Sequence, residues 1–194
     1  MSGLSDISLR CFIAIDIPEP IKRELGDISD LLKKYDVDIK WVPVSTIHLT
    51  VKFLGKTPEI LLQKIQESLF NVVLSYNPFY IKIYGVGVFP DRRHPRVVWI
   101  GTEESAALKQ LTVDIESSMA SLGFQKEKKD FSPHLTLGRV RSQRGMIQLL
   151  HELDNFRDRD FGNMSVDHIL LMKSELKSTG AEYSRLCAIP LGGK

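Results

Sequence analysis

Two short segments of this chain have nearly the same sequence, and this near-repeat constrains the fold more than any other feature. Residues 46–51 read TIHLTV and residues 132–137 read SPHLTL, so that His48 and His134 lie 86 positions apart. Polar and apolar residues alternate in both segments, which is the pattern of a half-buried β-strand. Successive side chains of a strand point to opposite faces. Each segment therefore presents a histidine and a threonine on one face and an apolar face that needs a core.

The rest of the sequence predicts strands that alternate with amphipathic helices. Strands are expected over residues 9–16, 38–42, 47–54, 79–89, 96–101, 132–140, 165–174 and 183–189, and helices over 19–35, 59–76, 105–122 and 145–153. Hairpin-like pairs, such as the runs on either side of the loop 90–95, favour antiparallel pairing. We therefore expect an α+β fold with antiparallel sheets rather than a doubly wound parallel fold. No Ser/Gly linker divides the chain, so we expect one domain over residues 1–194, with residues 1–8 as a flexible N-terminus.

Composition narrows the class of protein. Hydrophobic residues make up 43% of the 194 residues, and 26 Lys and Arg against 24 Asp and Glu give a net charge of +2. This charge is too small for a nonspecific nucleic-acid binder. The longest apolar runs fall far short of the roughly 18 residues that span a bilayer, and the first eight residues lack the features of a secretory signal. We therefore expect a cytoplasmic protein without a membrane partner, in which Cys11 and Cys187 are buried thiols.

The paired motif suits phosphoester chemistry if the two strands face each other across a cleft. Near neutral pH one imidazole can take a proton from a nucleophile while the other, as imidazolium, protonates the leaving oxygen. His48 and His134 are therefore candidate acid and base catalysts. The hydroxyls of Thr50 and Thr136 can donate hydrogen bonds to phosphate oxygens.

Two other interpretations of the paired motif stay open. The repeat can be a duplicated scaffold whose histidines are structural. It can also be a metal pair, which is disfavoured because no third ligand stands at a recognisable spacing and threonine is a poor zinc ligand. On this reasoning we expect no metal.

Further segments extend the pattern to nearly the whole chain. They are RCFIAID at 10–16, KWVP at 40–43, HLTVKFLG at 48–55, GVFP at 87–90, RVVW at 96–99, FSPHLTLGRV at 131–140, SEL at 174–176 and GAEY at 180–183. With these segments the chain resembles the 2H phosphoesterase superfamily, and within it the RNA 2′,3′-cyclic phosphodiesterase (2′-5′ RNA ligase-like) family. Ala181 departs from the family pattern, in which a proline is common at this place.

The resemblance implies a bilobal α+β fold. In such a fold two antiparallel sheets flank a central cleft, helices cover the outer faces, and each lobe contributes one His-x-Thr (HxTx) strand. The resemblance also implies chemistry without a metal or cofactor, with His48 as the proton donor and His134 as the proton acceptor. The implied reaction is hydrolysis of an RNA 2′,3′-cyclic phosphate end to a 2′-phosphomonoester by a two-histidine acid/base mechanism.

Two other functions remain open at this point. One is a 2′-5′ RNA ligase that joins tRNA halves, and the other is an RNA-end binding module with little turnover. The expected partners are RNA ends with a 2′,3′-cyclic phosphate, tRNA fragments among them, or cyclic nucleotides. The expected oligomeric state is a monomer.

Two basic residues beyond the motifs are candidates for substrate binding. Arg139 resembles the family's basic residue at this place. Strict alternation would point it away from His134, but a bulge at Gly138 would turn it toward the phosphate. Its alternative role is a surface ion pair. Lys52 shares the alternation of His48 and is expected to face the cleft or solvent.

Two phenylalanines and one loop complete the candidate set. Phe53 and Phe12 can each stack on a base, since every base has a π-face, and core packing is the alternative for both. The loop at residues 91–96 reads DRRHPR, so it can contact RNA phosphates away from the reacting end or be a plain solvated turn.

Overall fold

The computed structural model describes residues 7–177 and 180–193 of the chain. Within these residues the strands form one curved antiparallel sheet in the order β7-β4-β5-β6-β3-β1-β8-β9, and β2 pairs with β6 beside this path. The strands are β1 (Ser8–Ile15), β2 (Ile39–Trp41), β3 (Leu49–Pro58), β4 (Phe79–Phe89), β5 (Val97–Thr102), β6 (His134–Val140), β7 (Asp160–Val166), β8 (His168–Lys177) and β9 (Gly180–Pro190). The predicted α+β class with antiparallel pairing is confirmed.

Four α-helices accompany the sheet in the described part of the chain. They are α1 (Glu19–Leu32), α2 (Leu62–Val73), α3 (Ala106–Ser121) and α4 (Met146–Asp154), with 3-10 turns η1 (Val44–Thr46), η2 (Glu59–Leu61) and η3 (Leu191–Gly193). Each helix buries the apolar stripe that its periodicity predicts, for example Ile21, Leu25 and Ile28 of α1. The Ser105 side chain caps α3 by accepting a hydrogen bond from the Leu108 N–H.

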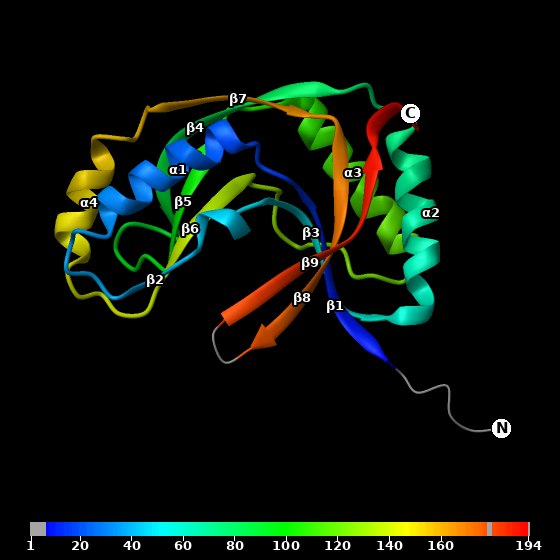
Figure 1. Ribbon diagram of the computed structural model, residues 1–194, viewed down its shortest axis with the longest axis horizontal. Helices are drawn as coiled ribbons and strands as arrows, with labels where there is room; N and C mark the ends of the chain where they lie inside the picture. The colour runs from blue at the N-terminus through cyan, green and yellow to red at the C-terminus, as the bar shows by residue number, and fades with distance from the viewer. Residues whose placement is uncertain (1–6, 178–179, 194) are drawn as a thin grey trace.

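The helices divide the sheet into two halves. One half, here the His48 half, contains β3, β1, β8 and β9 with α2 and α3, and the other, the His134 half, contains β2, β4, β5, β6 and β7 with α1 and α4. Figure 1 shows the two helix pairs at opposite ends of the curved sheet, with the β8–β9 hairpin extending away from it. The strands β3 and β6, which carry the two motifs, meet where the halves join.

A single residue pair joins the two halves. Leu49 of β3 pairs with Leu135 of β6, and no other pair links these two strands. The expectation of two separate sheets is therefore wrong, because this pair makes the hydrogen-bonded ladder continuous from β7 to β9. The physical reason is that two antiparallel strands can pair at one apolar residue each and separate on either side of that pair.

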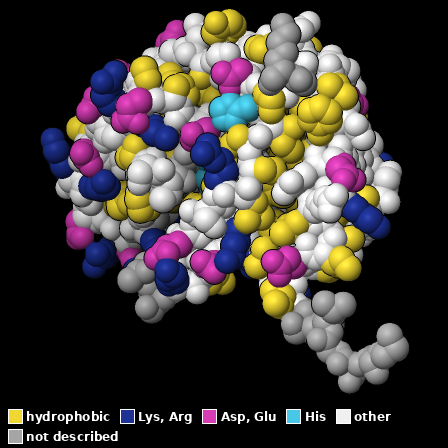
Figure 2. Space-filling view, turned by 45° about the vertical axis from the view of Figure 1, so that its right-hand side comes forward, with side chains coloured by type: hydrophobic (Ala, Val, Ile, Leu, Met, Phe, Trp, Pro, Cys, Tyr) yellow, Lys and Arg dark blue, Asp and Glu magenta, His cyan; other side chains and the backbone are white. Residues whose placement is uncertain are grey.

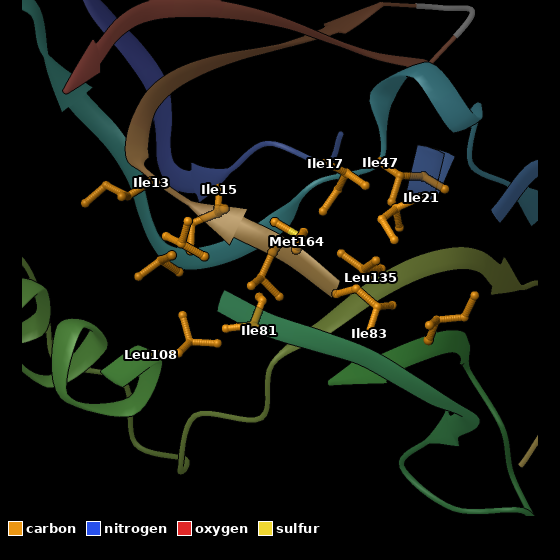
Figure 3. Packing of buried hydrophobic residues seen from close by; sticks show 14 of the residues in the cluster. Ile13, Ile15, Ile17, Ile21, Ile47, Ile81, Ile83, Leu108, Leu135 and Met164 are labelled. Atoms are coloured by element: carbon orange, nitrogen blue, oxygen red, sulfur yellow. The ribbon is translucent and has the colours of Figure 1, made fainter. Parts of the chain in front are cut away.

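One hydrophobic core serves both halves. Figure 3 shows residues of one cluster that come from both halves, with Ile13 and Ile15 of β1 toward the left, Ile81 of β4 below them, and Ile83 of β4 next to Leu135 of β6 toward the right. Leu49 and Leu135 are fully buried in this cluster. The face of the sheet that carries the leucines is thus the core face, and the opposite face, here called the open face, is available to the polar residues of the motifs.

The structure also differs in smaller ways from what we expected of the N-terminal segment and of the cysteines. Ser8 already pairs with Pro58, so the ordered strand begins inside the predicted flexible segment 1–8, of which residues 1–6 lie outside the described residues. Cys11 is buried as expected, whereas Cys187 is only partly buried. None of the helices in the described residues is long and apolar enough to cross a membrane.

Candidate active site

The four polar residues of the two motifs share the open face of the sheet. Leu49 and Leu135 point into the core, so the residues on either side of each leucine point the opposite way. Because β3 and β6 are antiparallel about the Leu49–Leu135 pair, Thr50 and His134 follow on one side of this pair, and His48 and Thr136 follow on the other. All four side chains are partly exposed. The structure thus places two imidazoles and two hydroxyls on one face of the sheet, around the Leu49–Leu135 pair.

Both imidazoles are anchored in the same way. His48 Nδ1 lies 2.9 Å from the Thr46 carbonyl oxygen, and His134 Nδ1 lies 2.8 Å from the Ser132 carbonyl oxygen. A carbonyl oxygen can only accept, so Nδ1 carries the hydrogen in each ring. In the neutral form this leaves the Nε2 lone pair as the site that can take a proton.

Aromatic rings hold the two histidines differently. The His48 ring is stacked on Phe12 with 4.8 Å between centroids, and the edge of Tyr183 meets it at 5.1 Å. Among the aromatic rings of the described residues, His134 contacts that of Phe89 alone, edge to face, with 5.0 Å between centroids. Burial lowers the pKa of His48 below its usual 6.5, while the hydrogen bond to Thr46 and the charge of Asp16 act in the opposite direction. The free protein therefore favours the neutral form of His48.

A β-bulge follows Thr50 and reverses the alternation of β3. Ala14 of β1 pairs with Thr50, but Ile13, the residue before it, pairs with Lys52, so Val51 is the extra residue. Paired residues lie on the same face, and Ile13 is fully buried. Lys52 therefore points to the core face.

The prediction that Lys52 faces the cleft or solvent is wrong for this reason. Its Nζ lies 2.8 Å from both carboxylate oxygens of Glu116 on α3 and 2.9 Å from the Gln125 carbonyl oxygen. Its side chain is fully buried. Lys52 is thus a structural cation that ties β3 to α3, and no residue next to it in the sequence signals the bulge that turns it inward.

The same bulge brings Phe53 to the open face. Phe53 pairs with Phe12, their ring centroids are 6.2 Å apart, and Phe53 is 57% exposed. Phe12 is 2% exposed and packs against His48 and Tyr183 instead of joining the main core. Phe53 can therefore offer an open ring face to a ligand, while Phe12 supports the imidazole.

A matching bulge occurs in β6. Thr136 pairs with Trp99 and Gly138 with Val98, so Leu137 is the extra residue. Arg139 then pairs with Val97, which shares the face of Trp99. The sequence predicted a bulge at Gly138, and the structure has it one residue earlier. Arg139 is exposed on the open face with no ion pair within the described residues.

Two residues of the site region carried no assigned role in the sequence. Tyr183 comes from β9, where it pairs with Ser174 of β8, and its ring contacts both His48 and Phe12. Trp99 lies beside Thr136 in β5. The segments GAEY and RVVW contain these residues, but only the tertiary structure connects them with the histidines.

The basic loop at residues 91–96 is held by its own hydrogen bonds. Arg92 forms two hydrogen bonds with the Asp154 carboxylate at 2.8 and 2.9 Å, and the Asp91 carboxylate accepts the N–H groups of Arg93 and His94. These bonds are those of an ordered turn.

Among residues 7–177 and 180–193 no cluster of three or more His, Cys, Asp or Glu side chains could hold a metal ion.

Figure 2 shows one face of the molecule, on which hydrophobic side chains gather toward the right and a mixture of Lys, Arg, Asp and Glu side chains toward the left.

Comparisons with known proteins find a family and several relatives of similar length. Residues 17–177 match the 2′-5′ RNA ligase superfamily. An RNA 2′,3′-cyclic phosphodiesterase of Methanocaldococcus jannaschii is 38% identical over 175 residues, which is 90% of this chain and 96% of the relative. One of Methanothermobacter thermautotrophicus is 34% identical over 178 residues, 92% of this chain and 96% of the relative.

Solved structures show the same fold. The crystal structure of TT0787 of Thermus thermophilus has a TM-score of 0.82 and 26% identity, and the match covers 96% of this chain and 100% of that one. The structure of E. coli LigT complexed with 3′-AMP has a TM-score of 0.78 at 23% identity, over 95% of this chain and 99% of that one.

Proposed function

The chain belongs to the 2′-5′ RNA ligase superfamily, and we propose that it hydrolyses the 2′,3′-cyclic phosphate at RNA ends to a 2′-phosphomonoester. The observation that carries this proposal is the pair of imidazoles, each anchored through Nδ1 and each beside a threonine on one face. The names of the relatives support the substrate class.

The reaction needs one proton acceptor and one proton donor. In the proposed direction His134 Nε2 takes a proton from water, the water oxygen attacks phosphorus, the P–O3′ bond breaks, and the His48 imidazolium protonates O3′. Thr50 and Thr136 donate hydrogen bonds to the nonbridging oxygens, where negative charge grows. General acid and base steps of this kind typically contribute about 10²–10⁴-fold each.

The protonation of His48 fits this direction once substrate is bound. Burial lowers the pKa of His48 in the free protein, which disfavours the imidazolium. An anionic phosphate close to the ring favours the charged form and raises this pKa. We propose that substrate binding itself charges His48, so that the donor forms where it is used.

We propose that neither a metal nor a cofactor takes part and that the monomer is the catalytic unit. The two imidazoles supply both proton-transfer groups, and both come from one chain. RNA fragments with cyclic phosphate ends, those of tRNA included, are the proposed substrates.

A direct test uses adenosine 2′,3′-cyclic phosphate in the presence of excess EDTA, with the 2′- and 3′-monophosphates separated by chromatography. We expect turnover to the 2′ isomer, with a bell-shaped dependence of kcat/KM on pH because one imidazole must be neutral and the other protonated. His151→Ala, which changes an exposed histidine of α4, is the matched control. Activity that EDTA abolishes and Zn²⁺ or Mn²⁺ restores would contradict the metal-free mechanism. Binding without turnover would instead favour the RNA-end binding module.

A further inference from the structure

Two basic residues lie opposite each other on the open face of the His134 half. Lys40 of β2 pairs with Arg139 of β6, and side chains of directly paired residues lie on the same face of a sheet. Ile39, next to Lys40, is buried in the core, so Lys40 points away from the core, as Arg139 does. Both residues are exposed.

This pair of cations has no acidic partner within residues 7–177 and 180–193, where neither Lys40 nor Arg139 forms an ion pair. Like charges directly opposite each other in a sheet are destabilising. The strand lysine Lys82, by contrast, lies 2.8 Å from a carboxylate oxygen of Glu103. An anion bound between Lys40 and Arg139 would relieve their repulsion, so the pair favours an anionic ligand.

The position of Lys40 relative to the motifs follows from the edge of β6 that β2 and β3 share. β3 pairs with this edge at Leu135, and β2 pairs with it at residues 138–140. Thr136 lies between these two places in β6, and His48 lies in the chain between β2 and β3. Lys40 is therefore on the side of the Leu49–Leu135 pair where His48 and Thr136 lie.

The Lys40 side chain also reaches the strand that contacts His48. A Cβ at Gly180 of β9 would lie 3.5 Å from Lys40 Nζ, although β9 belongs to the His48 half. Three residues further along β9, the ring of Tyr183 lies 5.1 Å from the imidazole of His48. Three residues of a strand span about 10 Å. This length is comparable with the separation of neighbouring phosphates in an RNA strand.

The proposed reaction places a second phosphate on this same side. His48 protonates O3′, so the ribose that carries O3′ lies on the His48 side of the reacting phosphorus. In an RNA chain the O5′ of this ribose carries the internucleotide phosphate upstream of the cyclic end. A free cyclic nucleotide has no such phosphate.

We propose that Lys40 binds the internucleotide phosphate immediately upstream of the cyclic end, so that the site favours the end of an RNA chain over a free cyclic nucleotide. This inference rests on the proposed function. Arg139, in the same strand as Thr136, contacts the reacting phosphate, and Lys40 beside it contacts the next one. Contacts of this kind position a nucleic acid without reading its sequence.

The kinetic test compares two substrates at low salt. One is adenylyl-(3′-5′)-adenosine with a 2′,3′-cyclic phosphate end, and the other is adenosine 2′,3′-cyclic phosphate. Lys40→Gln should lower kcat/KM for the dinucleotide at least about 5-fold, because one phosphate contact is lost. It should leave kcat/KM for the mononucleotide within about twofold, since the mononucleotide lacks the upstream phosphate.

Two variants serve as controls for this test. Lys40→Arg keeps the cation and should retain the preference for the dinucleotide. Lys64→Gln removes an exposed lysine of α2 and should change neither rate.

A binding test separates this inference from the proposed function, because its ligands do not react. Calorimetric titration compares adenosine 3′-monophosphate with adenylyl-(3′-5′)-adenosine 3′-monophosphate. Lys40→Gln should weaken only the binding of the dinucleotide. The affinity of a single strand falls with salt by a logarithmic slope of about 0.7 for each phosphate contact, so the variant should lose about 0.7 of this slope. This readout holds even if wild type hydrolyses no cyclic phosphate.

Two results would overturn the inference. Equal losses for the mononucleotide and the dinucleotide would place Lys40 at the terminal phosphate. Unchanged affinity and unchanged salt slope for the dinucleotide would make Lys40 a surface cation without a ligand.

Discussion

The two halves of the sheet repeat one local structure around their histidines and surround it with different residues. In each half Nδ1 is bonded to the carbonyl two residues earlier, a leucine points into the core, and a bulge follows the threonine. The backbone of the motif is therefore nearly the same twice. The differences lie in the side chains that the bulges and the neighbouring strands bring next to it.

Equivalent positions show how far the halves diverge. The residue after the bulge is Lys52 in the His48 half, where it is buried against Glu116. In the His134 half it is Gly138, where a Cβ would lie 2.5 Å from the Ile39 side chain. One residue further, Phe53 in one half corresponds to Arg139 in the other. The threonines pair with Ala14 in the His48 half and with Trp99 in the His134 half.

This difference teaches how a duplicated motif can be adapted to two roles. The rings of Phe12 and Tyr183 enclose His48, and burial lowers its pKa, so on the proposed mechanism a bound phosphate is needed to charge it. His134 has the ring of Phe89 beside it instead. Four experiments test this asymmetry.

The largest expected effect comes from the histidines themselves. His48→Ala and His134→Ala should each lower kcat for cyclic phosphate hydrolysis by at least about 10²-fold, because each removes one proton-transfer step. Steady-state rates with adenosine 2′,3′-cyclic phosphate measure this effect. If either variant keeps activity within threefold of wild type, one half suffices and the paired mechanism is wrong.

The next effect concerns the residues behind the bulges. Lys52→Met should lower the free energy of unfolding by about 3 kcal/mol, because it leaves the Glu116 carboxylate without its cation in a mostly buried place. Urea denaturation measures it. Lys33→Met, which breaks an exposed ion pair with Asp30, is the control and should change stability by less than about 1 kcal/mol. A variant with unchanged stability and lost activity would indicate that Lys52 binds the substrate instead.

A smaller effect is expected for the hydrogen-bond donors. Thr50→Val, Thr136→Val and Arg139→Ala should each lower kcat/KM by about 10- to 150-fold, since a hydrogen bond to a charged oxygen contributes roughly 1.5–3 kcal/mol. The pH profile should keep its shape because these groups move no proton. An Arg139→Ala variant with wild-type kcat and KM would mean that Arg139 does not bind the phosphate and that only the two threonines do.

The smallest effect is the pH dependence of stability. The folded pKa of His48 lies below the unfolded value of 6.5, so the unfolded chain binds more protons there. The stability that the folded protein gains from a neutral His48 is fully present above pH 6.5. This stability is lost as the pH falls through the folded pKa. His48→Gln should therefore flatten the decline of unfolding free energy below pH 6.5, and His151→Gln should not. Equal slopes for all three proteins would contradict the lowered pKa.

Local patterns predicted much of the fold and the centre of the site. The spacing of Ile21, Leu25 and Ile28 indicated a helix, and the alternation in TIHLTV and SPHLTL placed each histidine with its threonine. Both signals depend only on helix and strand periods, so a single sequence contains them. Gly138 even indicated a bulge, because a glycine inside a strand pattern is typical of one.

The sequence alone determined that two strands each carry a histidine and a threonine on one face, because alternation is a property of the strand itself. Only the tertiary structure decided what surrounds them. The pairing of Leu49 with Leu135 made one sheet of two expected ones, the bulge at Val51 turned Lys52 inward and Phe53 outward, and Tyr183 and Trp99 reached the site from other strands. Register between strands depends on partners distant in the chain, and no local pattern around Val51 encodes it.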